Sequence, residues 1–309
     1  MNASRLRWCA AAAGVLAIGP CLMIGADGNA DGGKVLVRPK YEPGLALRYN
    51  LKLSGATAWT PAPEGVHWGK MSTDLTAVLA TKVIRDSGAC TFNLLGERLT
   101  SSGQGPKGAV RVDATREKVR LTVNGKRVTG EKGPLARPMT MTFGPRGAHL
   151  FGTGLAPIAI YMLPHVDRRF WTLLTVAPLK EVAPGEEWSD EFDLPVPGGK
   201  GRPLKLKGRW KVLGWQSYQR RKVLAMSLAA ELTLGDSDLM LKNGDVIHVT
   251  SGTYKADGKV MWDVAEGRLC FAEAAQKLLV RADRPIARAL RSEARCTLSL
   301  LRAAVRAKR

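Results

Sequence analysis

The sequence predicts a mainly β protein, an antiparallel curved sheet or half-barrel built from two similar halves, with a short helical insert around 155–175. Apolar and polar residues alternate over Leu45–Leu53 and again over Leu204–Val212, which is the period of a strand with one buried face. Asn-Gly or Asp-Gly pairs, which suit tight hairpin turns, occur at 124–125, 243–244 and 257–258. Four prolines and three glycines divide the connection Val176–Gly199, with one extended run around Trp188.

Residues 1–26 are typical of an export signal. Arg5 and Arg7 precede the apolar run Trp8–Ile18, and small residues suited to cleavage lie between positions 21 and 30. We therefore expect an exported chain, periplasmic or extracellular. Two alternatives stay open: an uncleaved membrane anchor, and a lipid on Cys21, where the preceding Pro20 departs from the small residue that lipidation favours.

Residues 27–40 predict a flexible linker. Their segment DGNADGGK begins like a calcium loop, but Arg38 stands where that loop needs a glutamate. It also resembles a phosphate loop, but Val35 replaces the hydroxyl residue that would hold magnesium. Neither site is predicted.

The first β half is expected over 41–176. A loop at 55–69 carries Trp59, His67 and Trp68, which we expect to fold back onto the sheet. Further strands are predicted at 75–83, 89–95, 119–123 and 139–143, with a turn at 86–88. Over 150–177 we expect irregular or helical packing, including a short helix at 167–175 with Phe170, Trp171 and Leu174 facing inward.

The second β half is expected over 177–301. Leu204–Val212 places its basic residues on the solvent side, as a one-sided antiparallel sheet requires. These residues form a speculative anion-facing surface: Lys205, Lys207, Arg209 and Lys211. Strands are also predicted at 224–232, 253–262 and 268–271, with a turn near Ser217, and Met261–Gly267 parallels Met141–Gly147.

The C-terminus carries two competing periodicities. Arginines gather on one side of a helical wheel over 284–309, as in a basic membrane-surface helix. Residues 293–301 also alternate as a strand does, and we predict the strand because the sheet needs a final partner. That leaves 302–309 as a basic tail.

Charge and cysteine content set broad limits. The formal net charge of +20 favours contact with polyanions or anionic membranes, or simply a basic surface. Beyond the signal the cysteines are Cys90, Cys270 and Cys296, so at most one bridge forms within the chain. Cys270 with Cys296 is the pair to consider, and buried free thiols are the alternative.

The sequence predicts no catalytic residue, cofactor or metal ligand. Its histidines (67, 149, 165 and 248) lack the spacing of a zinc site, and no nucleophile motif occurs. His165 and Asp167, two residues apart, do not face each other on a helix. The paired acids at 186–187 and 190–191 could serve glycoside hydrolysis, but successive strand residues point to opposite faces, which favours solvated charge.

Three segments carry a resemblance: Pro178-x3-Val182-x2-Gly185-Glu-x-Trp188, Gly252-Thr-Tyr, and Met261-Trp-Asp-Val-x2-Gly267-Arg-Leu. They resemble recurrent features of a family of exported bacterial β-rich proteins of unknown function, over most of the mature chain. The resemblance implies a mostly antiparallel β fold and brings no functional residues. By looser analogy such sheets are similar to the open half-barrels of lipoprotein carriers, which cup apolar ligands.

We therefore expect an exported, non-enzymatic cell-envelope protein that binds an apolar or anionic envelope component. An apolar ligand and an anionic membrane surface are the expected partners, and no specific nucleic-acid motif occurs. Two alternatives stay open. One is a structural or interaction protein whose sheet encloses only side chains, and the other is a hydrolase that assembles carboxylates from distant strands.

Overall fold

A computed structural model describes residues 33–60, 67–105, 108–128, 135, 139–153, 173–194, 204–240, 246–284 and 288–305. Its strands are β1 (Leu45–Thr60), β2 (His67–Ile84), β3 (Cys90–Gly105), β4 (Gly108–Thr115), β5 (Val119–Val123), β6 (Lys126–Val128), β7 (Met139–Phe143), β8 (His149–Thr153), β9 (Glu187–Leu194), β10 (Leu204–Tyr218), β11 (Arg221–Leu234), β12 (Ser237–Met240), β13 (Val246–Asp263), β14 (Arg268–Arg284) and β15 (Arg288–Val305).

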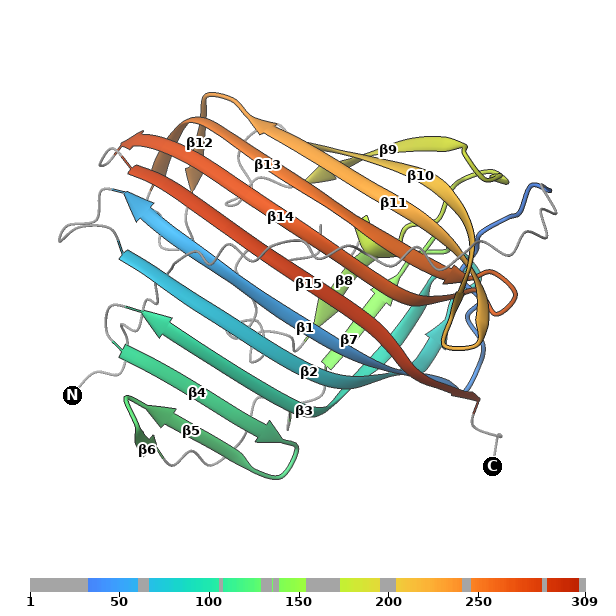
Figure 1. The fold of residues 1–309 in the computed structure, drawn as a ribbon, viewed down its shortest axis with the longest axis horizontal. Coiled ribbons are helices and arrows are strands. Elements are labelled where there is room, and N and C mark those ends of the chain that lie inside the picture. The colour runs from blue at the N-terminus through green and yellow to red at the C-terminus, as the bar shows by residue number, and fades with distance from the viewer. Residues whose placement is uncertain are drawn as a thin grey trace.

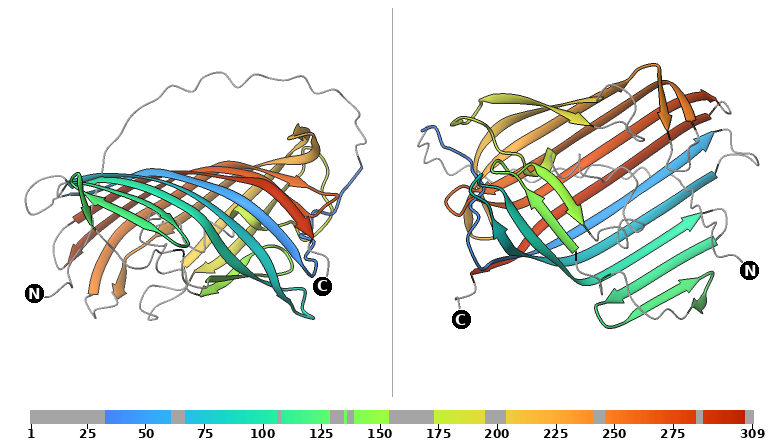
Figure 2. Two further views of the ribbon diagram at one scale, coloured as in Figure 1. Left: turned by 90° about the horizontal axis from the view of Figure 1, so that it is seen from below. Right: turned by 180° about the vertical axis from the view of Figure 1, so that it is seen from behind.

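The strands form one antiparallel sheet in the order β6-β5-β4-β3-β2-β1-β15-β14-β13-β11-β10-β9, with β12 paired to β13 (Figure 1). The sheet is strongly curved, so it has a concave and a convex face (Figure 2). The predicted fold class, a mainly β antiparallel curved sheet, is confirmed. The two predicted halves occupy adjacent parts of this sheet and meet where β1 pairs with β15.

The predicted C-terminal strand is confirmed and is longer than expected. Leu51 of β1 lies opposite Leu298 of β15, so apolar side chains from the two ends of the chain share one face. The pairing shifts by one residue at Leu301, which brings Ala303 opposite Leu47 on that face. Residues 302–305 therefore belong to the sheet and not to a basic tail, and 306–309 lie outside the described residues.

The expected loop at 55–69 is wrong over most of its length. β1 continues to Thr60 and β2 begins at His67, with Ala58 paired to Trp68. The inward positions that begin at Leu45 continue through Gly55 and Thr57. The strand therefore extends past Leu53, although these two residues are not large and apolar. Residues 61–66, and the side chains of Trp59, His67 and Trp68, lie outside what the structure describes.

Two predicted turns need correction. Asp257-Gly258 lies inside β13, where Gly258 pairs with Leu228 of β11 and Ala274 of β14. Glycine is needed there because a Cβ would lie 2.1 Å from the Glu273 carbonyl oxygen, so the signal reflects close approach of strands. The turn expected near Ser217 lies instead at Gln219 and Arg220, whose φ angles are 48° and 64°.

The Asn124-Gly125 hairpin turn is confirmed. It joins β5 to β6 with φ angles of 50° and 78°, the left-handed conformation that such a two-residue turn requires. Asn243-Gly244 lies outside the described residues. The strands that flank it, β12 and β13, are paired with each other.

The segment expected as the end of a flexible linker is packed. The Val35 amide donates to the Val182 carbonyl oxygen at 2.9 Å, and Val37 belongs to the hydrophobic core. The Lys40 amide donates to the Gly267 carbonyl oxygen at 3.0 Å, so residues 33–40 are fixed against the second half. The predicted export signal and the remainder of the linker, residues 1–32, lie outside the described residues.

An inner layer lies over part of the concave face. β7 pairs with the first five residues of β3, and β8 pairs with β7, at the end of the sheet where β1 begins (Figure 2). Residues 149–153 are therefore a strand, although they lie at the edge of a region expected to be irregular or helical. Of the predicted helical insert, the structure describes one helical turn at 173–175, in which Leu173 and Leu174 are buried, and the rest lies outside it.

Candidate functional site

The two faces of the sheet differ in chemistry because each strand alternates. In β1, Leu51 and Leu53 are buried on the concave face, whereas Lys52 is exposed on the convex face. β10 and β13 follow the same rule, with Trp210 inward and Lys211 outward. The concave face is therefore the apolar face, and it is the candidate binding surface.

Small residues occupy the inward positions at the centre of the concave face, which we call the floor. The register of five adjacent strands brings these inward positions side by side: Gly55, Ala230, Ala256, Gly258, Ala272, Ala274, Ala294 and Cys296. Because their side chains are short, this floor is low compared with the surrounding leucines. Strands with short side chains on one face can also approach and curve more closely.

Larger apolar side chains surround this floor, and their burial differs between its two ends. Where β7 and the helical turn at 173–175 lie, inward residues such as Leu99, Leu224 and Met226 are fully buried. Toward the end where β1 finishes, several inward apolar residues are only half-buried, although Leu232 and Leu234 at the same end are buried. The half-buried residues are Met71, Val110, Leu278, Val280 and Leu290, and Val119 and Leu121 of the outer strand β5 are half-buried as well. This end offers the partly accessible apolar surface of the concave face.

Polar side chains interrupt the apolar face in three cross-strand pairs. The Tyr254 hydroxyl donates to Gln276 Oε1 at 2.9 Å. The Thr57 and Ser292 hydroxyls lie 2.7 Å apart, and those of Thr73 and Ser101 lie 3.0 Å apart. Sequence reasoning missed these residues. A polar residue at an inward position of a strand was the available signal, and it required knowledge of the register.

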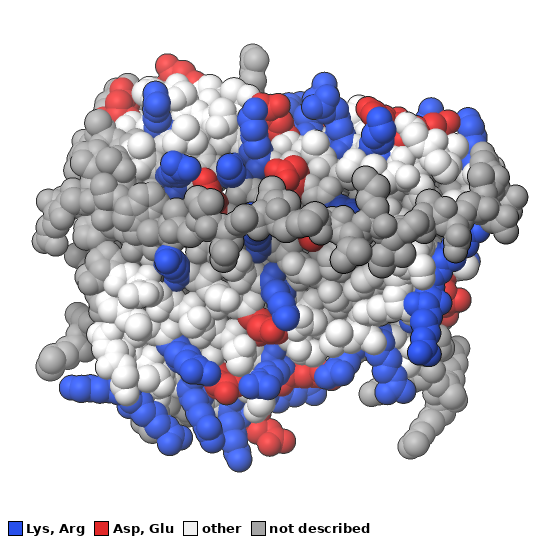
Figure 3. All heavy atoms as spheres, in the orientation of Figure 1, with Lys and Arg blue, Asp and Glu red and all other residues white. Residues whose placement is uncertain are grey.

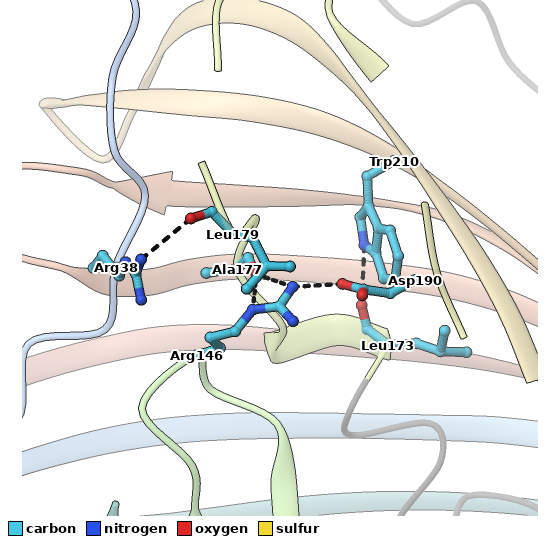
Figure 4. Close-up of polar contacts among 7 residues, drawn as sticks. All are labelled: Arg38, Arg146, Leu173, Ala177, Leu179, Asp190 and Trp210. Carbon is cyan, nitrogen blue, oxygen red and sulfur yellow. Dashed lines mark hydrogen bonds and ion pairs between the residues drawn. The ribbon is translucent and has the colours of Figure 1, made fainter. Parts of the chain in front are cut away.

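A clasp holds the inner layer to the edge of the sheet (Figure 4). Arg146, in the β7–β8 turn, donates from Nε and Nη2 to the Ala177 carbonyl oxygen at 3.0 and 2.8 Å, and Nη2 also pairs with Asp190 of β9. The side chains are only 22% and 19% exposed, so this pair is screened less than a surface ion pair. Nearby, Trp210 Nε1 donates to the Leu173 carbonyl oxygen at 3.3 Å.

The predicted anion-facing residues Lys205, Lys207, Arg209 and Lys211 are all exposed on the convex side of β10. Acids lie across from them: Glu187 Oε1 is 2.9 Å from Lys211 Nζ, and Glu191 and Glu231 flank Lys207 in the register. The same row continues across the sheet with both signs of charge: Glu191, Lys207, Glu231, Lys255, Lys277 and Glu293. Figure 3 shows acids interspersed among the basic side chains of this face, as expected of a water-facing surface.

The paired acids beside Trp188 serve in structural contacts. Glu186 accepts from the Ala183 amide, which lowers the pKa of its carboxyl group, and Lys211 does the same for Glu187. Asp190 is part of the clasp described above and is not simply solvated, as the sequence suggested. A two-carboxylate hydrolase requires two acids that face the same bond of the substrate. These acids do not converge in that way.

His248 lies between two carboxylates at the β12–β13 edge. Its Nε2 lies 2.9 Å from Asp236 Oδ1 and its Nδ1 lies 2.7 Å from Asp238 Oδ1. His165 and Asp167, and the side chains of His67 and His149, fall outside the described residues.

Cys90, Cys270 and Cys296 are buried free thiols, so the Cys270–Cys296 bridge is not formed. Burial raises the pKa of the Cys90 thiol to about 11, and it also raises the pKa values of Cys270 and Cys296. All three are therefore protonated near neutral pH, which disfavours a nucleophilic role. Within the described ranges no three His, Cys, Asp or Glu side chains group as metal ligands. No described helix has the length and apolar character needed to cross a membrane.

Comparisons with known proteins do not identify a family for this chain. No protein-family model and no curated protein matches the chain, so membership of an exported bacterial family stays a prediction. Among solved structures the chain aligns with lipovitellin, from a study of lipid–protein interactions, with a TM-score of 0.43 and 11% identity, covering 87% of this chain. It spans about a quarter of lipovitellin, 26% of that chain. It also aligns with OccK7 (OpdD) of Pseudomonas aeruginosa, with a TM-score of 0.26 and 9% identity, over 85% of this chain and 99% of that one.

Proposed function

We propose that this chain is an exported, non-enzymatic protein of the cell envelope that binds an apolar molecule against the concave face of its sheet. One observation carries the proposal: the floor of glycine and alanine is continuous with a half-buried apolar end, where Met71 and Leu278 face inward. Half-buried apolar surface on the inside of a curved sheet is suited to a long-chain molecule.

The hydrophobic effect supplies enough free energy for such binding. A chain that buries ten methylene groups against this face gains about 8 kcal/mol, at ~0.8 kcal/mol per methylene. Association costs on the order of 4 kcal/mol or more in lost translational and rotational freedom. An unbranched acyl or alkyl chain therefore suits the site better than a small apolar molecule, because only the longer chain clearly exceeds this cost.

The convex face supports a different role, contact with solvent or with a charged surface. Acids are interspersed among its lysines and arginines across neighbouring strands, so the basic residues form no uniform positive surface in the part of the chain described. Lys205, Lys207, Arg209 and Lys211 stay the candidates for contact with an anionic membrane. The distribution of charge favours the apolar ligand as the primary partner.

The proposal is tested by binding of N-phenyl-1-naphthylamine, a neutral apolar fluorophore, to the purified chain. Ala274→Leu adds bulk to the concave floor, whereas Ala275→Leu adds the same bulk to the convex face one residue later. We expect saturable binding to the wild type, a loss of about tenfold or more in affinity for A274L, and near-wild-type affinity for A275L. Melting curves check that both variants fold. Absence of saturable binding, or equal loss in both folded variants, would contradict the proposal.

Export is tested separately by N-terminal sequencing of protein made in a bacterial host. The mature chain should begin between Leu22 and Asp31. An intact Met1 on protein recovered from the cytosol would contradict export and would leave the binding proposal unaffected.

A further inference from the structure

Gln276 is a buried amide at the centre of the apolar floor. It is 2% exposed, and it lies between Ala256 of β13 and Ala294 of β15 in the register. Neither alanine can form a side-chain hydrogen bond. A glutamine amide has donors on nitrogen and an acceptor oxygen, and leaving either group unpaired away from water is costly.

Only one end of this amide is satisfied within the described structure. Tyr254 donates to Gln276 Oε1 at 2.9 Å, which fixes the amide orientation. Gln276 Nε2 is buried and has no hydrogen-bond partner. The inward hydroxyl groups near it are engaged: Ser292 bonds Thr57 at 2.7 Å and donates to the Ala56 carbonyl oxygen at 3.0 Å.

The groups around Gln276 Nε2 indicate which kind of ligand atom could bind to it. The nitrogen donates, so the partner must supply an acceptor oxygen. Besides Tyr254 and Ser292, the neighbouring inward side chains are apolar, among them Ala274 and Leu278, and the register places no Lys or Arg at the inward positions beside Gln276. An ionised carboxylate would be buried there without a counter-charge, which is unfavourable, so a neutral carbonyl oxygen suits the site better.

We propose that Gln276 binds the neutral carbonyl oxygen of an acyl ester whose hydrocarbon chain lies along the glycine–alanine floor. The inference rests on the proposed function and names the ligand class within it. The amide recognises the head of the acyl chain, and Tyr254 acts as a positioning residue that holds the amide with Nε2 toward the ligand. The apolar floor supplies affinity, and Gln276 supplies the preference for an ester over a hydrocarbon.

The test is displacement of N-phenyl-1-naphthylamine by methyl dodecanoate, dodecane and dodecanoate. In the wild type we expect methyl dodecanoate to displace the fluorophore about fivefold to tenfold more effectively than dodecane, the effect of one hydrogen bond. Dodecanoate at neutral pH should be weaker than its methyl ester. In Gln276→Leu the advantage of the ester over dodecane should disappear, while dodecane itself still displaces the fluorophore.

Gln216→Leu is the matched control, because Gln216 is exposed on β10 and accepts from Lys259 at 2.8 Å. It should keep the wild-type preference. Melting of Q276L shows whether it folds, and Gln276→Met, which also lacks the amide, provides a second variant. Equal displacement by ester and dodecane in the wild type, or an ester preference retained in the folded variants, would overturn this inference alone. A preference for dodecanoate would also overturn it. Failure of all three molecules to displace the fluorophore would instead overturn the proposed function.

Discussion

Replacing Trp210 by alanine tests the assignment of the concave face. Trp210 is 1% exposed, stacks on Trp188 with ring centroids 5.5 Å apart, and meets Phe192 edge-on at 6.3 Å. Its ring also covers Gly208, where a Cβ would lie 2.4 Å from the indole. Truncation of a buried tryptophan costs ~3–5 kcal/mol, and loss of the stacked pair and of the bond to Leu173 places W210A near the upper end.

The loss is measurable as a change in unfolding. At roughly 2–4 °C per kcal/mol for a domain of this size class, W210A should melt about 8–20 °C lower than the wild type. Urea unfolding should give a lower midpoint with a similar slope. Trp210→Phe keeps a ring but removes the indole N–H, so it should lose about 1–2 kcal/mol. Near-wild-type melting of W210A would show that Trp210 is exposed and that the inward and outward faces are reversed.

Three further predictions follow from the packing of the strands. Gly258→Ala should lower the melting temperature markedly, because its Cβ would lie 2.1 Å from the Glu273 carbonyl oxygen. Gly103→Ala is the control and should change the melting temperature little, because the nearest atom would be 3.6 Å from its Cβ. Equal melting of the two variants would contradict the close approach of β13 and β14. Thiol titration with Ellman's reagent at pH 8 should label Cys90, Cys270 and Cys296 slowly in the native protein and fully in guanidinium. The Cys90 thiol keeps its proton in the fold up to a pKa of about 11 but ionises near 9.0 when unfolded, so its contribution to stability should fall as pH rises through this window, and rapid native labelling would contradict its burial. Deleting residues 293–309 should abolish cooperative unfolding because β1 and β14 both lose their partner strand, and a stably folded deletion product would contradict the pairing.

Much of the fold could be predicted because single strands report which face is buried. Leu45–Leu53 and Leu204–Val212 alternate clearly, since one face meets the core and the other meets water. Asn124-Gly125 indicated its turn because both residues accept positive φ. Asp257-Gly258 gave a wrong turn prediction, because a glycine is also needed inside a strand where a neighbouring strand approaches closely. Only the position of the Glu273 backbone in the next strand distinguishes such a glycine from a turn glycine.

The candidate site was much less predictable than the strands. Gln276 stands in a stretch in which alternation is weak, so its inward position follows only from the pairing of β14 with β13 and β15. The clasp joins Arg146 to Asp190 across two elements that no local pattern connects. The burial of Val37 likewise depends on a segment far along the chain, at Val182.

Photo-crosslinking tests the central claim, that an apolar chain binds the concave face, most directly. The purified full chain would be irradiated with a methyl ester of hexadecanoic acid that carries a diazirine near its end, and the labelled residues would be identified by mass spectrometry. We predict labels on inward residues at the half-buried end, such as Met71, Leu278 and Leu290, that excess methyl hexadecanoate suppresses. Labels on outward residues such as Lys255 or Arg295, or labelling that the excess ester does not reduce, would contradict binding at this face.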